Sequence, residues 1–529
     1  MTHIGEIAVP RSLSHGHTAA TLPDLLAQQA AARGAAVALL HKRHGIWQRQ
    51  TWREVADTAA RWAAALTDLG VARGDNVVIA GANRPRLLIA MLACQIRGAV
   101  PVLVPQAGAG AGLAQVLRAH PAKLVFAAGE HEVHAIHAIR ADLAMQPNVI
   151  CDDLRGLRSL WDNWLTDWDA WDRAAEAVRD SGDVPESATA AIVFAPGDTE
   201  ARQPITLTHR AVASAALSVV DGYRVTPKDR TVLAVPFGWP SALVLGTAQA
   251  LASGGSLAIA ESDATVLADL REAGPTLLFG PPLLFRQIRQ AGFRHVCGTA
   301  TPWRDVICHA LGFTGAAAVP PGMLGRVLLA MLRKRLGLSR LRLAISTEAA
   351  ASPQVTAFFE SLGVPMQVFA DPQGPAAPAA VAQEARLTGS VFIRAAYATA
   401  TAGGIGVALI APDAAAITLW ARQRGEALRS TEDIAALPSV IALLAAEIAT
   451  AEPAIGRFLI AAQGLSPQAG DIAPDGTVQH TAAERLHAAA LARLRSGGGI
   501  AVEPRPQAQA AEPASQATIW AMQAGIGVL

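Results

Sequence analysis

Short apolar segments alternate with helix-like segments along most of the chain, and this alternation limits the possible folds more than any other feature. Residues 74–85 contain a short apolar run between turn signals, 87–98 have helical character, and 99–104 form a second apolar run. A strand, a helix and a strand in that order predict a parallel sheet. Further apolar runs of strand length lie at 122–129, 148–153, 190–197, 230–237, 255–260, 276–282, 340–346 and 364–371. The sequence therefore predicts a large α/β fold.

The region before the first of these runs is expected to be mainly helical. Residues 22–70 have helical character, with a short strand or turn at 45–50. Thr51 and Glu54 have the spacing of a capping box, in which the two residues bond each other's backbone N–H groups at a helix start. Gly70 is a typical helix stop.

Composition restricts the partners of the chain. It has 529 residues, of which 51% are hydrophobic and 16% charged, so a folded protein with a large core is expected. The 44 Lys and Arg residues balance 43 Asp and Glu residues, and this balance offers no electrostatic footprint for nucleic acid. The N-terminus lacks a basic region followed by an apolar core, so no signal peptide is expected.

Cysteines and the longest uncharged stretch bear on metals and membranes. Cys94, Cys151, Cys297 and Cys308 show no CxxC pair and no zinc-ligand spacing, so we expect no metal site, no disulfide framework and a cytoplasmic location. The uncharged stretch 231–260 is interrupted by prolines and glycines, which favours internal packing over a membrane span. At most, we expect it to support peripheral membrane contact.

Lysine is rare in this chain. Of its 44 cationic side chains, the lysines are Lys42, Lys123, Lys228 and Lys334, and the others are arginines. Any chemistry that needs a lysine amine must therefore use one of these four. No lysine follows Lys334.

The segments resemble the AMP-forming acyl-CoA synthetases, most closely their long-chain fatty acid branch. The similarity lies in separate blocks that keep their order along nearly the whole chain, namely TLPDLL (21–26), GIWQRQTWREV (45–55), LGVARGDNVVIAGANRP (69–85), RGAVPV (97–102), NVICDDLRGLRSL (148–160), LTHRAV (207–212), LLFGPPLLFRQI (277–288), RLGLSRLRLAIS (335–346), SPQVTAFFESLGVP (352–365), VALIAPD (407–413) and ITLWARQRG (417–425). The resemblance implies a large multi-sheet adenylate-forming-type N-terminal domain and a small α+β C-terminal domain. It also implies a reaction in which ATP and a carboxylate form an acyl-adenylate, from which CoA displaces AMP.

The first motif of the resembling family holds the ATP triphosphate. Its pattern is TSGTTGxPKGVxLTH, whose hydroxyls, backbone N–H groups and lysine suit phosphate oxygens. Residues 192–209 read IVFAPGDTEARQPITLTH, in which Gly197, Thr199, Thr208 and His209 match the pattern. The departures are Ala195 and Pro196 for small hydroxyl residues, Asp198 and Glu200 as added negative charges, and Gln203 or Pro204 for the lysine. As a phosphate-binding loop, this segment is weak.

A second motif, YGxTE, supplies an aromatic ring near adenine and a glutamate for Mg²⁺ in the family. Phe369, Asp371 and Gln373 occupy the corresponding stretch, with Pro372 in place of the threonine. A vestigial nucleotide site is therefore expected, comprising Gly197, Thr199, Thr208, Phe369, Asp371 and Gln373. The family's glycine turn SGGAP has become STEAA at 346–350, which favours a filled pocket.

Two further positions are assigned to the substrate. Trp239 stands where the family carries the histidine of a PLAH pattern, and Gly280 follows an apolar run in the block LLFGPPLLFRQI. A bulky indole in place of an imidazole changes the space available to an acyl chain. We expect Trp239 and Gly280 to lie on the substrate side of the site, and no residue to bind a metal.

The C-terminal part lacks the family's catalytic lysine. The stretch GDIAPDGTVQH at 470–480 places Thr477 at that position, so no catalytic residue is assigned. The block that normally carries a ribose-binding aspartate and a hinge appears deleted between 374 and 404. We therefore expect an AMP-binding-like N-terminal domain at 1–375, a joint at 376–390 that replaces the hinge block, a remnant C-terminal domain at 391–497 and a loose Pro/Ala/Gln-rich tail at 498–529.

Three functions remain open from the sequence. The favoured one is a synthetase-like protein without adenylation chemistry that acts as a binding, regulatory or scaffold protein, with no cofactor. The second is an active ligase that uses ATP, Mg²⁺ and CoA, with Arg202 and Arg485 replacing the lysines. The third binds acyl chains or acyl-CoA without adenylation. The expected partners are a fatty acid, acyl-CoA or another protein, and not nucleic acid.

Overall fold

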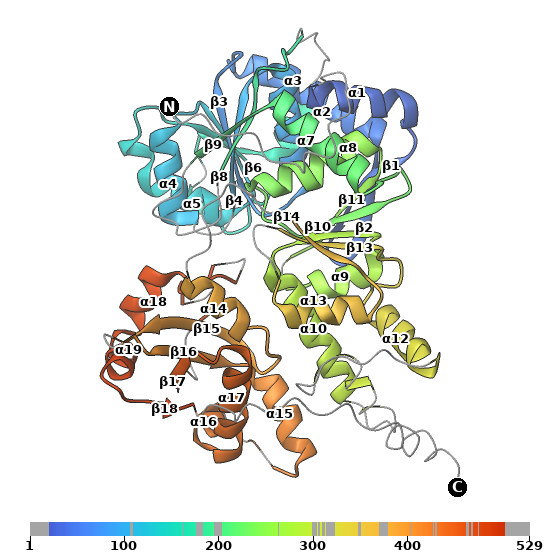
Figure 1. Ribbon diagram of the computed structural model, residues 1–529. Coiled ribbons are helices and arrows are strands. Elements are labelled where there is room, and N and C mark those ends of the chain that lie inside the picture. The colour runs from blue at the N-terminus through green and yellow to red at the C-terminus, as the bar shows by residue number, and fades with distance from the viewer. Residues whose placement is uncertain are drawn as a thin grey trace. The chain divides into compact units, whose positions relative to one another are not determined.

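The computed structural model describes residues 21–502 with short gaps and divides by packing into two compact units. The gaps are 106–108, 161, 176–182, 195–203, 263, 299–303, 305–306, 309–310, 312, 314–322, 348–350, 370–378, 402–403, 427, 429–430, 462–464, 467–468 and 474–475. The first unit comprises Met1–Pro378 with Leu465–Leu486, and the second comprises Ala379–Gly464 with His487–Leu529. Figure 1 labels the helices and strands of both units.

Sheet I of the first unit has the strand order β7-β6-β5-β3-β4-β8-β9 and is parallel except for the antiparallel pair β8 and β9. Its strands are β3 (Asn76–Gly81), β4 (Val100–Pro105), β5 (Leu124–Ala127), β6 (Asn148–Cys151), β7 (Leu165–Asp167), β8 (Thr189–Phe194) and β9 (Pro204–Thr208). The expected strand, helix and strand over 74–104 form β3, α3 (Pro85–Arg97) and β4. The α/β prediction is confirmed here.

Sheet II has the order β14-β13-β12-β10-β11-β1-β2, and its strands are parallel except for the antiparallel pair β1 and β2. These are β1 (Val37–Arg43), β2 (Ile46–Thr51), β10 (Arg230–Leu233), β11 (Ser256–Ile259), β12 (Leu277–Gly280), β13 (Leu343–Thr347) and β14 (Met366–Phe369). The mainly helical prediction for 22–70 missed β1, which pairs with the distant strand β11. Because that partner lies far along the chain, no local pattern marks the pairing.

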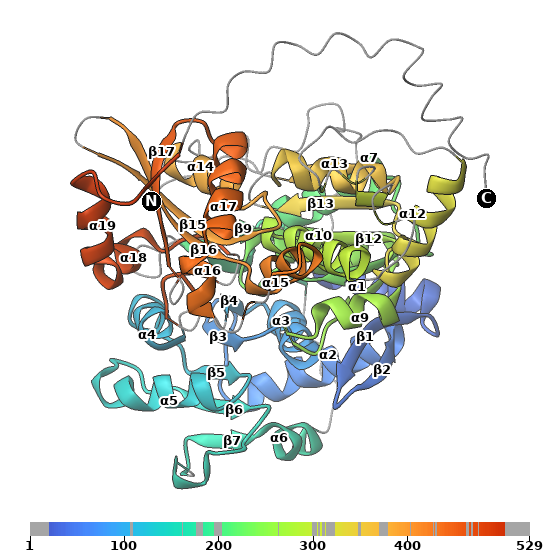
Figure 2. The same cartoon turned by 90° about the horizontal axis from the view of Figure 1, so that it is seen from below.

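Helices fill the space between the two sheets and cover their other faces (Figures 1 and 2). Those packed between the sheets are α1 (Leu22–Arg33), α2 (Trp52–Asp68), α3, α7 (His209–Gly222) and α8 (Gln249–Ser253). Alternate residues of β3 serve the two faces of sheet I: Val77 and Ile79 join the core between the sheets, whereas Val78 and Ala80 join the core under α4 and α5. The remaining helices of this unit are α4 (Ala109–Ala119), α5 (Glu130–Ile139), α6 (Trp168–Ala174), α9 (Val266–Ala273), α10 (Pro282–Cys297), α12 (Met323–Arg335), α13 (Pro353–Ser361) and α18 (His480–Leu486).

Helix α2 begins as the sequence predicts. The Thr51 hydroxyl accepts the Glu54 N–H, and the Glu54 carboxylate accepts the Thr51 N–H at 2.7 Å. This hydrogen bond to the Thr51 backbone lowers the pKa of Glu54. The predicted capping box is confirmed.

The uncharged stretch 231–260 lies inside the first unit. It contains most of β10, the π-helix η4 (Ala242–Ala248), α8 and β11, and most of its side chains are buried. The prediction of internal packing is therefore confirmed. Among the helices that the structure describes, none combines the length and the apolar character needed to cross a membrane.

The second unit is a small α+β body around a four-stranded sheet of order β15-β16-β17-β18. Its strands are β15 (Ile393–Ala400), β16 (Gly406–Pro412), β17 (Ile455–Ile460) and β18 (Ile500–Ala501), and its helices are α14 (Ala379–Leu387), α15 (Ala414–Gln423), α16 (Thr431–Ala436), α17 (Pro438–Ala451) and α19 (Ala488–Arg495). Part of the expected joint at 376–390 is thus the helix α14. The first residues of the expected tail at 498–529 contribute β18.

Candidate functional site

Neighbouring strands of sheet II end side by side, and several sequence-predicted positions fall on those ends. Gly280 pairs in register with Ser346, and Thr347 pairs with Phe369, so residues from three separate motifs lie on β12, β13 and β14. Ligands of open parallel sheets bind outside the carboxyl ends of the strands. We call these four residues, together with the turn 237–241 after β10, the strand-end site.

Gly280 does not face open space in this arrangement. It is buried in β12, and a Cβ atom on it would lie 2.6 Å from Cδ2 of Leu284 in the first turn of α10. Leu284 is itself buried. An apolar side chain therefore covers the position that was expected to face a substrate.

Trp239 belongs to the core between the two sheets. Its side chain is 6% exposed, and its backbone N–H donates to the backbone oxygen of Pro236 in a tight turn. The turn packs on sheet I, because Gly238 O accepts the Phe194 N–H at 2.9 Å and a Cβ on Gly238 would lie 2.5 Å from Leu103 O. The indole thus fills space where the sequence placed it beside an acyl chain.

Three buried hydroxyls, those of Ser241, Ser346 and Thr347, lie at the strand-end site. Thr347 Oγ1 and Ser241 Oγ are almost inaccessible to solvent and make no hydrogen bond in the part of the chain that the structure describes. A buried hydroxyl without a partner loses its hydration without replacement. Neither group carries charge, so neither offsets the charge of a phosphate.

Thr208 and His209 have structural partners. Thr208 Oγ1 accepts the Ala211 N–H at 3.2 Å and caps α7. His209 Nδ1 accepts the Leu22 N–H at 3.3 Å, and burial lowers the pKa of this imidazole to about 4. Of these two matches to the phosphate motif, Thr208 thus caps α7, and His209 links α7 to the start of α1. Gly197, Thr199, Asp371 and Gln373 lie outside the described residues.

A loop closed by a carboxylate carries Thr477. Asp471 is fully buried, and its oxygens accept the Leu465 N–H at 2.9 Å and the Ser466 N–H at 2.7 Å. Across the loop, the Ala473 N–H donates to Thr477 O at 2.8 Å. These bonds fix the backbone around Thr477.

This loop lies against the start of α10, within the first unit. Gly476, with a φ of 84°, packs on Leu283, and a Cβ on it would lie 3.0 Å from the Cβ of Leu283. Leu283 is three residues after Gly280 in the sequence. The structure therefore brings the loop that carries Thr477, the position matched to the family's catalytic lysine, against the helix that follows Gly280.

Comparison with known proteins identifies the fold. A family model described as "AMP-binding enzyme" matches residues 26–370, which is more than half of the chain. The chain belongs to the AMP-binding enzyme family. The resemblance that the sequence motifs indicated is confirmed.

Solved structures agree on the AMP-binding fold. The adenylation domain of a carboxylic acid reductase from Segniliparus rugosus, in complex with AMP and a co-purified carboxylic acid, is 14% identical with a TM-score of 0.69, over 91% of this chain and 95% of that one. The corresponding domain from Mycobacterium chelonae is 14% identical with a TM-score of 0.70, over 91% and 92%. At these identities the likeness concerns the fold alone. No curated protein matches the chain.

Two of the four lysines of this AMP-binding protein, Lys42 and Lys123, form ion pairs with carboxylates of the fold. Lys42 Nζ lies 3.0 Å from Asp269 Oδ1 and 2.7 Å from Glu272 Oε2, and these hydrogen bonds raise the pKa of Lys42. Lys123 pairs with Asp75 at 2.9 Å. Lys123 directly precedes β5, so it lies at the amino end of sheet I, away from the ends where ligands bind.

Most of the residues that the motifs assign to ATP and Mg²⁺, namely Gly197, Thr199, Asp371 and Gln373, lie outside the described residues. Enzymes of the AMP-binding family use ATP, Mg²⁺ and CoA. The described residues hold no group of three side chains suited to a metal ion, and the four register-paired residues of the strand-end site are uncharged. No reaction step that involves a nucleotide is therefore assigned to these residues.

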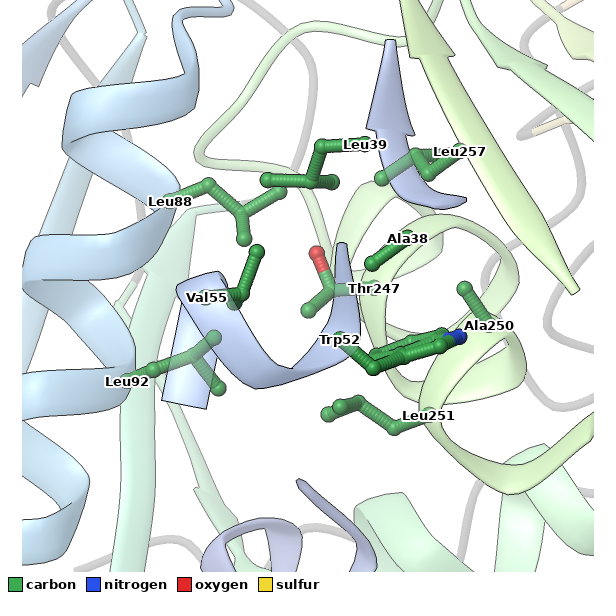
Figure 3. A pocket seen from close by; sticks show the side chains of 10 residues that line it. All are labelled: Ala38, Leu39, Trp52, Val55, Leu88, Leu92, Thr247, Ala250, Leu251 and Leu257. Atoms are coloured by element: carbon green, nitrogen blue, oxygen red, sulfur yellow. The ribbon is translucent and has the colours of Figure 1, made fainter. Parts of the chain in front are cut away.

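A small apolar cavity lies in the core of the first unit (Figure 3). Its volume is about 10 Å³, which is the room for a single water molecule and not for an acyl chain. Its lining is apolar except for Thr247 and consists of Ala38, Leu39, Trp52, Val55, Leu88, Leu92, Thr247, Ala250, Leu251 and Leu257.

The thiols of Cys297 and Cys308, which form no recognised sequence motif, lie close together in the structure. The sulfur atoms of Cys297, at the end of α10, and Cys308 lie 3.4 Å apart. Burial raises the pKa values of Cys94 and Cys151, which keeps those thiols protonated. No sequence pattern marks the Cys297–Cys308 contact, because the spacing of these two residues matches no motif.

Proposed function

We propose that this protein keeps the AMP-binding fold without adenylation chemistry and acts as a binding, regulatory or scaffold protein. One observation carries the proposal. The loop that matches the family's catalytic-lysine segment packs on Leu283 beside Gly280, yet it presents Thr477. Since no lysine follows Lys334, no shift of register supplies the missing amine.

The missing groups belong to separate parts of the reaction. The segment matched to the triphosphate loop lacks its lysine, and Gln373 stands where a glutamate would hold Mg²⁺. The aspartate that binds the ribose is missing, and Thr477 stands where a lysine would stabilise the adenylate as it forms. Removal of one such electrostatic group costs about 10²–10³ in rate, or roughly 3–4 kcal/mol. Four losses together are expected to leave little catalysis.

The alternatives receive less support from the described residues. An active ligase would need Arg485 to replace the lysine, but this side chain is exposed on α18. An acyl-binding function needs an apolar cavity of several hundred Å³. Leu284 and Trp239 fill the strand-end site instead.

The decisive experiment is ATP–pyrophosphate exchange with the full chain over fatty acids of several lengths. We expect exchange at the background of a reaction without protein. Exchange well above that background would reject the proposal. If exchange were found, Arg202→Ala and Arg485→Ala would identify the replacing cation, with Arg118→Ala as an exposed control.

Thermal unfolding with ligands separates a binding protein from a scaffold that binds neither ligand. A ligand at about 100 times its Kd adds roughly 2.7 kcal/mol of stability. Stabilisation by acyl-CoA but not by ATP would favour acyl binding without adenylation. Stabilisation by neither ligand would favour a scaffold or regulatory role.

A further inference from the structure

Helix α12 exposes a row of large apolar side chains. Met323, Val327 and Met331 are 86%, 54% and 60% exposed, whereas Leu329 and Leu332 on the same helix are buried. Figures 1 and 2 both show α12 at the edge of its unit, beyond sheet II. Side chains of this kind, four residues apart, form one stripe along a helix. An exposed stripe of this length is a candidate interaction surface.

Arginines flank this stripe on both sides. At about 100° of rotation per residue, Met323, Val327 and Met331 cover an arc of about 80°. Arg326 then lies about 60° beyond one edge of the arc and Arg335 about 40° beyond the other. Both arginines are exposed. Long cationic side chains beside an apolar stripe can reach phosphate groups while the stripe enters an apolar layer.

The charged residues of α12 and the segment that follows it have one sign. Residues 323–342 contain six Arg and Lys residues and no Asp or Glu. Lys334 and Arg335 are exposed in the last turn of α12. Arg333 has a different role, because its guanidinium donates to Leu338 O and Leu341 O and closes the helix end.

We propose that the exposed face of α12, formed by Met323, Arg326, Val327, Met331, Lys334 and Arg335, docks the protein on an anionic lipid bilayer. A bilayer surface offers both of the complements that this face requires, negative headgroups for the cations and an apolar layer for the stripe. Nucleic acid would satisfy the cations alone. The docking face lies apart from the strand-end site, so the proposal stands or fails independently of the missing adenylation.

The test is sedimentation of the full chain with vesicles. Each basic side chain near an anionic surface contributes roughly fivefold in affinity. We expect the protein to sediment with vesicles of phosphatidylcholine and phosphatidylglycerol in equal parts, and at least tenfold less with phosphatidylcholine alone, by about the same rule. High salt should weaken the binding.

Variants separate the two components of the face. The pair Lys334→Glu and Arg335→Glu should lower binding about 25-fold or more. The pair Val327→Glu and Met331→Glu should lower it by at least about the same factor, because it removes apolar contact and adds two negative charges. Matched controls are Ile46→Glu, whose side chain is 67% exposed elsewhere, and Lys228→Glu, and both should bind as the wild type does. Because all six positions are exposed, thermal unfolding midpoints should stay unchanged.

Three results would overturn the proposal. The first is equal or no sedimentation with the two kinds of vesicle. The second is wild-type binding by the Lys334 and Arg335 variant. The third is wild-type binding by the Val327 and Met331 variant together with release of the protein from vesicles by duplex DNA, which would indicate a general polyanion surface.

Discussion

In β10, β12, β13 and β14 of sheet II, the described amino ends and carboxyl ends are built from different kinds of side chain. At the amino ends of β10, β12 and β13, Asp229 accepts hydrogen bonds from Arg342 at 2.9 Å, from Thr276 Oγ1 at 2.7 Å and from the Thr226 N–H at 2.8 Å. At the carboxyl ends, Gly280 is covered by Leu284 and the Thr347 hydroxyl is buried without a partner in the described chain. At the described ends of β10, β12 and β13, charge and full hydrogen bonding are concentrated on the amino side, where open sheets do not bind ligands.

This difference shows where the polar residues of the sheet act. The Asp229 group joins three strands and, through Arg342, the carbonyl groups of Tyr223 and Arg224. It therefore stabilises the fold. The strand-end site, on which positions from three of the family-like motifs fall, contributes mainly packing. A protein that keeps the fold and lacks the reaction is expected to show this division.

The largest expected effect tests the packing role of Trp239. The substitution Trp239→Ala should lower the free energy of unfolding by about 3–5 kcal/mol, because it leaves a cavity in the core between the sheets. Denaturant unfolding of the full chain measures the loss. The control Trp47→Ala removes a half-buried indole at the edge of sheet II and should cost about 1 kcal/mol.

The opposite result would change the comparison between the two ends. If Trp239→Ala cost less than about 1 kcal/mol, and a fatty acid stabilised the variant, the indole would line an accommodating pocket. The carboxyl ends would then be a ligand site that one side chain closes.

At the amino ends, Asp229→Ala should cost about 3 kcal/mol, because the substitution leaves Arg342, Thr276 and Thr226 without their shared acceptor. The same unfolding measurement applies. Asp57→Ala, an exposed position on α2, is the control and should change stability by less than about 0.5 kcal/mol. A loss as small as the control's would remove the structural role assigned to this end.

Acid should weaken the same group. Burial alone would raise the pKa of Asp229, but hydrogen bonds from Arg342, Thr276 and Thr226 outweigh it and lower the pKa from 3.8 to about 2. Its contribution is thus complete above the unfolded-state pKa and is lost as the pH falls from about 4 to about 2. The loss is about 2 kcal/mol.

The measurement compares the wild type with Asp229→Asn between about pH 5 and pH 2. The difference in unfolding free energy between the two proteins should shrink by about 2 kcal/mol over this range. A difference that stays constant with pH would show that the carboxylate charge does not stabilise the folded protein.

The same threonine-to-valine substitution at the two ends of sheet II should change the free energy of unfolding in opposite directions. Both changes should be smaller than those above. Thr276→Val removes a hydroxyl that donates to Asp229 and accepts the Arg230 N–H at 2.9 Å, so it should cost about 1–2 kcal/mol. Thr347→Val replaces a hydroxyl without a partner by a methyl group and should be neutral or stabilising by up to about 1 kcal/mol. Destabilisation by Thr347→Val equal to that of Thr276→Val would indicate that Thr347 binds a group at the strand ends.

The positions of many strands along the chain were predictable from sequence because buried parallel strands are continuous apolar runs. The runs around β3 and β4 and the capping box at Thr51 are local features, and the structure confirms them. Strand β1 was missed because its parallel partner β11 is more than 200 residues away. Local periodicity contains no information about such a partner.

The candidate site was predictable only in part, for a similar reason. Motif order placed Gly280, Ser346 and Phe369 on strand ends, and register then brought them together. That Leu284 covers Gly280 and that Gly476 packs on Leu283 depends on three-dimensional contacts that no motif records. The approach of Cys297 to Cys308 was missed on the same ground.

The smallest expected effect concerns the loop against α10. The substitution Thr477→Lys returns the family's amine to a backbone that Asp471 holds in place. We expect pyrophosphate exchange to stay at the wild-type level, because the lysine of the phosphate loop and the Mg²⁺ glutamate are still missing. Stability should change by less than about 0.5 kcal/mol.

The control Thr477→Gln adds a side chain of comparable reach without charge, so it separates an effect of the amine from an effect of bulk beside Leu283. A rise in exchange of about 10² with lysine but not with glutamine would mean that the rest of the strand-end site still binds and orients both substrates. The strand-end site, whose four paired residues are uncharged, would then be one side chain away from catalysis, and the contrast with the amino ends would reflect a single loss instead of several.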